Sequence, residues 1–148
     1  ESEKNASTYK DKKFKVIFIK KNSENYERIQ VSIKSNDKKF IIYSIDGIID
    51  FDDRINECKK EKKIIIADLT KLIGDFERFD EDKKHRADKS GESFIYGSWF
   101  FLNNGGFFEV SCVDYGSEVY KSHGWTDELN VSITSNEFSL YLENDAYN

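Results

Sequence analysis

Short runs of alternating hydrophobic and polar residues dominate the chain and predict β-strands. Phe14–Ile19 and residues 29–33 are two such runs, and residues 40–45 form a third β-rich segment. The gaps between them are rich in Asn, Ser and Asp, which favour turns. Residues 129–133 predict a further strand. We therefore expect an antiparallel sheet that has one face exposed to water in its first three strands.

A β-hairpin is predicted for residues 93–114, where two apolar segments flank an Asn-Asn-Gly-Gly turn. Asn104-Gly105 suits the two central positions of a type I′ turn, because both take positive φ there. This two-residue loop pairs Leu102 with Phe107, Phe101 with Phe108, Trp99 with Val110 and Gly97 with Cys112.

Residues that lie opposite one another share a face of the sheet, so this register predicts which hairpin face is buried. The predicted core face carries Ile95, Trp99, Phe101, Phe108, Val110 and Cys112. The mixed face carries Tyr96, Ser98, Phe100, Leu102, Phe107, Glu109, Ser111 and Val113.

The hydrophobic period changes near Asp50 and predicts a helix. On a helical projection, an apolar stripe about 120° wide contains Phe51, Ile55, Cys58, Ile65, Ile66, Leu69, Leu72 and Ile73. We predict one long amphipathic helix over about residues 52–73, with Cys58 on its buried face. The alternative, a short helix followed by a strand at residues 64–67, stays open because a short Ile run suits both.

The remaining segments complete an α+β fold. Residues 75–92 are strongly charged and predict a long surface connection, and residues 115–126 predict a second loop. The segment Thr134-Ser-Asn-Glu137 matches a capping box and predicts a short C-terminal helix. We expect a flexible leader over residues 1–13 and a single domain, mainly antiparallel β-sheet, over residues 14–148.

The two cysteines favour a compartment outside the reducing cytosol. Cys58 and Cys112 each lie on a predicted core-facing surface, which predicts a disulfide between them. The alternative is two unrelated buried thiols. The sequence contains no Met, so we expect a processed chain whose signal peptide has been removed, and an upstream lipid anchor is compatible with this. No run is apolar enough to span a membrane.

Charge and residue spacing argue against several classes of function. The formal net charge is −5, and the lysines are interleaved with acids, which argues against nucleic acid as a partner. His85 and His123 have no spacing that indicates a catalytic pair, so we expect no enzyme activity. In the acidic cluster after Asp50, Arg54 occupies a position where an EF-hand needs a ligand. The two Cys and two His also miss the spacing of structural zinc sites. We expect no metal and no cofactor.

Aromatic residues are abundant and favour a protein interface. They remain on the mixed hairpin face and crowd the loop after it, at Tyr96, Phe100, Phe107, Tyr115, Tyr120 and Trp125. The alternative for Phe100 and Phe107 is that another element covers them and forms a two-sided core.

The small size, the Cys58/Cys112 pair, the acidic balance and the α+β order together resemble small exported bacterial immunity and inhibitor proteins, namely periplasmic toxin immunity proteins and lysozyme inhibitors. The Ser-Gly-x-x-Tyr loop of some lysozyme inhibitors is not matched, because Phe94 stands where the tyrosine would be. The resemblance implies a periplasmic or secreted protein that binds a toxic enzyme, such as a toxin or hydrolase, and blocks it sterically. The expected contact residues are Asp88, Lys89, Ser90 and Glu92 in one loop and Tyr115, Tyr120, His123 and Trp125 in the other. A second hypothesis is an envelope or secreted domain that binds another protein, a glycan or a small ligand.

Overall fold

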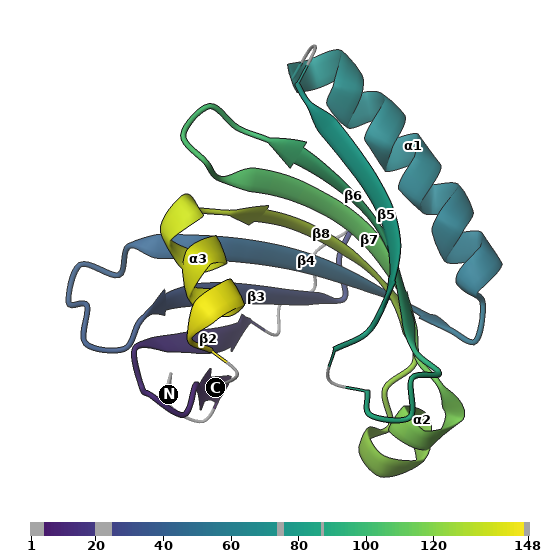
Figure 1. Cartoon of the computed structure of the whole chain (residues 1–148), viewed down its shortest axis with the longest axis horizontal. Helices are drawn as coiled ribbons and strands as arrows, with labels where there is room; N and C mark the ends of the chain where they lie inside the picture. The colour runs from purple at the N-terminus through teal and green to yellow at the C-terminus, as the bar shows by residue number, and fades with distance from the viewer. Residues whose placement is uncertain (1–4, 20–24, 74–75, 87, 147–148) are drawn as a thin grey trace.

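The computed structural model describes residues 5–19, 25–73, 76–86 and 88–146, and these residues form one antiparallel sheet with helices on both faces (Figure 1). The strands are β1 (Ala6–Thr8), β2 (Phe14–Ile19), β3 (Arg28–Lys34), β4 (Ile42–Asp52), β5 (Arg78–Lys84), β6 (Phe94–Phe101), β7 (Phe107–Asp114) and β8 (Asp127–Thr134). The helices are α1 (Ile55–Ile73), α2 (Ser117–His123) and α3 (Asn136–Asn144). The order of the strands across the sheet is β1-β2-β3-β4-β8-β7-β6-β5. The predicted α+β class is confirmed.

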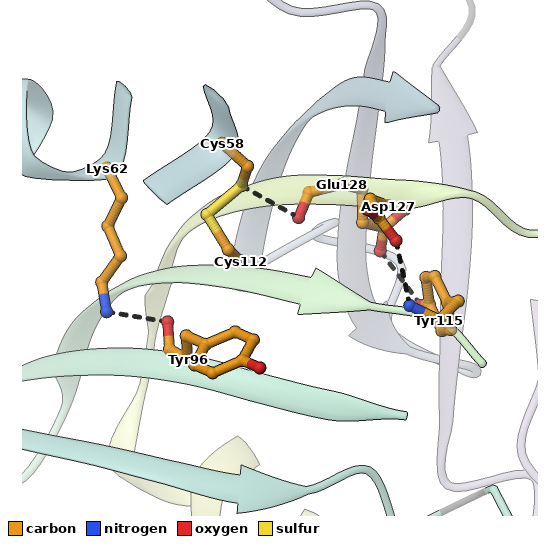
Figure 2. Close-up of a disulfide and its surroundings, with 7 residues drawn as sticks. All are labelled: Cys58, Lys62, Tyr96, Cys112, Tyr115, Asp127 and Glu128. Atoms are coloured by element: carbon orange, nitrogen blue, oxygen red, sulfur yellow. Dashed lines mark hydrogen bonds between the residues drawn. A yellow bond between two sulfur atoms is a disulfide. The ribbon is translucent and has the colours of Figure 1, made fainter. Parts of the chain in front are cut away.

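Helix α1 covers one face of the sheet and is continuous, so the alternative of a strand at residues 64–67 is wrong. Its inner side meets the central strands in a core of Cys58, Ile66, Phe100, Val110, Cys112 and Leu129. The predicted stripe is wrong at both ends. Phe51 belongs to β4 rather than to the helix, which begins at Ile55, and Leu72 is 82% exposed. Lys62, a polar residue within that stripe, reaches across the core edge and donates a hydrogen bond to the Tyr96 carbonyl at 2.7 Å (Figure 2).

The predicted disulfide is confirmed. Cys58 on α1 is bonded to Cys112 on β7, with their Cα atoms 6.0 Å apart, and both residues are fully buried. The Cys58 sulfur also lies 3.5 Å from the Glu128 carbonyl oxygen of the neighbouring strand (Figure 2). The bond therefore fixes the first turn of α1 to the middle of the sheet.

The predicted hairpin register is wrong by one residue. Gly105 donates a backbone hydrogen bond to Leu102 at 2.9 Å, and Leu102 donates one to Gly106 at 2.8 Å. Three residues, 103–105, therefore form the loop, with Gly105 in the left-handed region at φ 81°. This is the type I turn with an added bulge that three-residue hairpin loops adopt.

The added loop residue exchanges the two faces of β6 but not those of β7. The observed partners include Tyr96 with Cys112, Ser98 with Val110, Trp99 with Glu109 and Phe100 with Phe108. Val110 and Cys112 lie in the core as predicted, but their neighbours on β6 are Phe100 and Tyr96 rather than Trp99 and Ile95. Phe100 is buried under α1. This agrees with the alternative in which another element covers Phe100.

Helix α3 packs on the opposite face from α1, over the β2 end of the sheet (Figure 1). Phe138 and Tyr141 point inward and contact Phe14. The predicted capping box is displaced by one residue. Ser135 is the N-cap, and its side chain accepts a hydrogen bond from the Phe138 amide, whereas Thr134 belongs to β8.

Three segments expected to be irregular contain regular elements. Within the expected leader, Ala6–Thr8 pairs with β2 as the edge strand β1, and residues 1–4 lie outside the described part of the chain. The charged connection contains β5, whose side chains are all exposed at the other edge of the sheet. The loop expected at residues 115–126 contains α2.

Candidate functional site

The sheet face opposite α1 is hollowed into an open cavity of about 830 Å³. Its floor is formed by alternate residues of β3, β4, β8 and β7. Phe138 and Leu142 of α3 and Ser7 to Tyr9 flank one end, and His85, Tyr115 and residues 124–126 flank the other. A cavity of this size is within the range of sites that hold small molecules.

Polar residues form the centre of this floor. Ser132 on β8 is paired with Asp46 on β4 and with Glu109 on β7, so these three side chains form one row on the same face. Asp46 accepts only long hydrogen bonds from Ser44, of 3.4 and 3.5 Å. Among the described residues, neither carboxylate forms an ion pair. Burial and then the charge of Glu109 raise the pKa of Asp46 to about 7.

A second group of charges lies toward the end of the cavity that carries Tyr115. Arg28 of β3 donates to the carboxylate of Asp50 and, at 2.7 Å, to that of Glu128. The Tyr115 hydroxyl donates to the other Glu128 oxygen at 3.2 Å. Burial is the largest cause of a raised pKa for Glu128, although Arg28 opposes it. One guanidinium therefore serves two carboxylates, and this group keeps a net negative charge.

Two buried polar atoms at the cavity have no hydrogen-bond partner in the described part of the chain. They are Oδ1 of Asn130, on the cavity floor, and Nδ1 of His85, at the Tyr115 end. Burial lowers the pKa of His85 despite the nearby Asp88. A buried polar atom without a partner costs free energy, so both atoms are candidates for contact with a bound molecule.

Trp99 occupies the same face of the sheet at β6. Its ring lies over Gly97, where any Cβ would overlap it. Phe79 contacts the ring at a centroid distance of 6.3 Å, and the Lys83 ammonium lies 4.3 Å from its centroid. This aromatic group covers the β5–β6 end of the face and leaves the polar centre on β4, β8 and β7 open.

The two loops that carry the predicted contact residues meet in space. Gly116 donates its amide hydrogen to the Ser93 hydroxyl at 2.8 Å, and Ser117 donates to the Glu92 carboxylate at 3.2 Å. Between them lies a second, shallower hollow of about 650 Å³, lined by Asp88, Lys89, Ser90, Glu118, Val119, Lys121, Ser122 and His123.

The predicted contact residues are not all equally available to a partner. Tyr120 on α2 is 58% exposed, and Asp88 is engaged within its own loop. The amides of Ser90 and Ser93 donate to the Asp88 carboxylate at 2.9 and 2.8 Å. The hydrogen bonds from Ser90 and Ser93 hold the Asp88 pKa well below its usual range.

A series of aromatic rings connects the two hollows. His85 contacts Tyr115, Tyr115 contacts Trp125, and Trp125 contacts His123, at centroid distances of 5.5, 5.4 and 4.8 Å. Tyr115 and Trp125, predicted as protein contacts, line the large cavity, whereas His123 lines the shallower hollow. Tyr115 is also held by its amide, which donates to Asp127 at 3.1 Å (Figure 2).

Sequence reasoning missed the cavity floor. Asp46 and Glu109 stand alone among apolar neighbours on separate strands, and only the pairing of both strands with β8 brings them together. The available signal was the polar residues Ser44, Asp46 and Asp50, which share one strand face with Ile48 and extend beyond residue 45, where the strand was expected to end.

The described residues contain no group of three or more His, Cys, Asp or Glu side chains placed to hold a metal ion. No helix among them is both long enough and apolar enough to cross a membrane. No family model, curated protein or solved structure matches this chain.

Proposed function

We propose that this protein is a non-catalytic binding protein that holds a small polar molecule in the cavity on the sheet face opposite α1. The observation that carries this proposal is a half-open cavity of about 830 Å³ with charged and polar side chains at its centre. An ordinary core would place apolar residues there, because buried polar groups without partners are costly.

Several features of the cavity support a binding role. The Asn130 and His85 atoms without partners are free to bond a ligand. Phe107, Ile48 and Phe138 supply apolar surface around the polar centre. The disulfide ties the β7–β8 part of the floor to α1, so the site lies on a rigid element of the fold. The same disulfide supports an exported protein that works in an oxidising compartment, in the periplasm or outside the cell.

A screen of small polar fragments by NMR on the isotope-labelled full chain tests this proposal. We expect hits to shift the backbone amides of β3, β4, β8 and β7. The variant Gln30→Trp adds a large side chain next to Asp46 in the cavity row and should reduce the affinity at least about tenfold. Hits that shift only residues outside the cavity, or that bind this folded variant unchanged, would show that the cavity is not the site.

A second function is favoured by the meeting of the two loops. We propose as the alternative that these loops capture a secreted toxic enzyme, as the resemblance to immunity and inhibitor proteins implies. Tyr120 and Trp125 are 58% and 45% exposed, and exposed Tyr and Trp are frequent anchors in protein interfaces. Lys89 and His123 line the hollow between the two loops.

The inhibitor proposal is tested on the immobilised protein with native envelope and secreted extracts. We expect one hydrolase or toxin to be retained in stoichiometric amount and to lose activity when bound. Replacing Tyr120 and Trp125 together by Ala should weaken capture by more than about tenfold. Asp68→Asn, at an exposed position of α1, is the control. Unchanged capture by the double variant would exclude these loops.

A further inference from the structure

We propose that the ligand of this cavity carries a positively charged amine, which binds above Ser132 between the carboxylates of Asp46 and Glu109. This inference rests on the proposed ligand-binding function and specifies the chemistry of the ligand. It is argued from the charges of the floor, from its geometry and from the apolar surface beside it.

The charges that line the cavity are predominantly negative. Asp46, Asp50, Glu109 and Glu128 contribute carboxylates, whereas Arg28 is the one lysine or arginine among the described lining residues. Arg28 is already engaged by Asp50 and Glu128, so Asp46 and Glu109 remain without a cation. In a partly enclosed site of low dielectric, an incoming positive charge is attracted more strongly than it would be in water.

The placement of the pair on either side of Ser132 suits a single ammonium group. Adjacent strands lie about 4.8 Å apart, so carboxylates two strands apart start from Cα atoms separated by about 10 Å. Ser132 lies between them, lines the cavity and is buried, and its short side chain fills little of the space between the two longer acids. A metal ion fits this arrangement less well, because no third metal-ligating side chain joins the pair within the described residues.

Apolar and aromatic side chains beside the pair suit the body of an organic amine. Phe107 is on the same strand as Glu109 and lines the cavity. Ile48, Phe18 and Phe138, from other elements, also line it. Aromatic faces also attract cations directly. The structure therefore favours a small organic amine with an apolar portion over an inorganic cation or a carboxylate-bearing molecule.

Three probes that share a phenyl ring and a two-carbon chain separate the effect of ligand charge from that of ligand shape. Phenethylamine is cationic, 2-phenylethanol is neutral and phenylacetate is anionic, and cellobiose serves as a neutral sugar. Each is titrated into the isotope-labelled full chain near neutral pH and followed by NMR. We expect phenethylamine to shift the amides of Asp46, Ser132 and Glu109, and to bind at least about tenfold more tightly than the alcohol.

Variants assign the effect to the two carboxylates. Asp46→Asn combined with Glu109→Gln should weaken phenethylamine at least about tenfold and bring its affinity close to that of the alcohol. Asp68→Asn, which removes one charge from the exposed side of α1, should leave the affinity unchanged. Circular dichroism and thermal unfolding establish that the double variant is folded.

The outcomes separate this inference from the proposed function beneath it. If 2-phenylethanol, phenylacetate or cellobiose binds in the cavity as tightly as phenethylamine, the amine inference is wrong and the cavity remains a binding site. An amine that keeps its affinity for the folded double variant also overturns it. If neither these probes nor the fragment screen shifts any cavity residue, both the inference and the proposed function fail.

Discussion

Asp46 and Glu109 lie on the two strands that flank β8, and each is paired with Ser132 on the same face of the sheet. The other charged or titratable groups around the cavity are Tyr9, Arg28, Asp50, His85, Tyr115 and Glu128. Arg28 bonds Asp50 and Glu128, while no ion pair reaches Asp46 in the described part of the chain. Two like charges are therefore held close together without compensation, and the folded state favours a protonated Asp46.

The first prediction is that Asp46→Asn stabilises the protein at and above neutral pH. The pKa of Asp46 is about 7 in the folded state, against 3.8 for an unperturbed aspartate. Between about pH 4 and 7, the folded protein therefore keeps a proton on Asp46 that the unfolded chain has lost. Stability from this group is present below about pH 4 and is lost as the pH rises through 7. Asn mimics the protonated acid, so we expect the variant to gain about 2–4 kcal/mol near pH 8.

Urea unfolding of both proteins at a series of pH values measures this difference. The gain should shrink as the pH falls from about 7 and vanish near pH 4 or below. Asp68→Asn, an exposed acid paired with Lys71 on α1, should differ from the parent by no more than about 0.5 kcal/mol throughout. A pH-independent gain for Asp46→Asn would contradict the assigned ionisation.

Local patterns predicted α1, α3 and the disulfide well, because their signals lie within short segments, whereas α2 was expected to be a loop. The 3.6-residue apolar period placed Cys58 on the inner side of α1, and either hairpin register points Cys112 toward the core. The length of the hairpin loop was not predicted correctly, because Asn103-Asn104-Gly105-Gly106 fits both a two-residue and a three-residue turn. That single residue decided whether Trp99 or Phe100 is in the core under α1.

The cavity could not be predicted from local patterns. Its floor combines residues from four strands, and their order depends on pairing between β4 and β8, which are far apart in the sequence. An acid such as Asp46, with Ile45 and Gly47 on either side of it in β4, is compatible with either a solvent-exposed or an enclosed face. The meeting of the two predicted contact loops likewise depends on bonds such as Gly116 to Ser93.

The second prediction concerns the start of α3. Ser135→Ala removes the side chain that accepts a hydrogen bond from the Phe138 amide, and should cost about 1 kcal/mol in the free energy of unfolding. Glu137→Gln tests the alternative capping box. It removes only an exposed ion pair with Lys34, so its cost should stay within about 0.5 kcal/mol. Equal losses for both variants would contradict the observed cap.

The third prediction concerns the disulfide, which closes a segment with a sequence separation of 54 residues. In the chain-entropy model, a loop of this length contributes about 4 kcal/mol. Replacing Cys58 and Cys112 together by Ala should lower the free energy of unfolding in urea by about this amount. The parent protein should lose similar stability in reductant, whereas the double variant should be insensitive to it. Stability that reductant leaves unchanged in the parent would contradict the prediction.

The fourth prediction concerns Gly97 and Trp99. Gly97→Ala should cost about 2 kcal/mol or more, because its new methyl group overlaps the Trp99 ring and the aromatic group must rearrange. Trp99→Ala removes the overlapping ring, so the cost of adding Ala at position 97 should fall by at least about 1 kcal/mol in that background. A double-mutant cycle in urea measures this coupling, and Trp fluorescence of the single variant reports the displaced ring. Additive losses would mean that the ring does not lie over Gly97, and that the β5–β6 end of this face is open like the polar centre beside it.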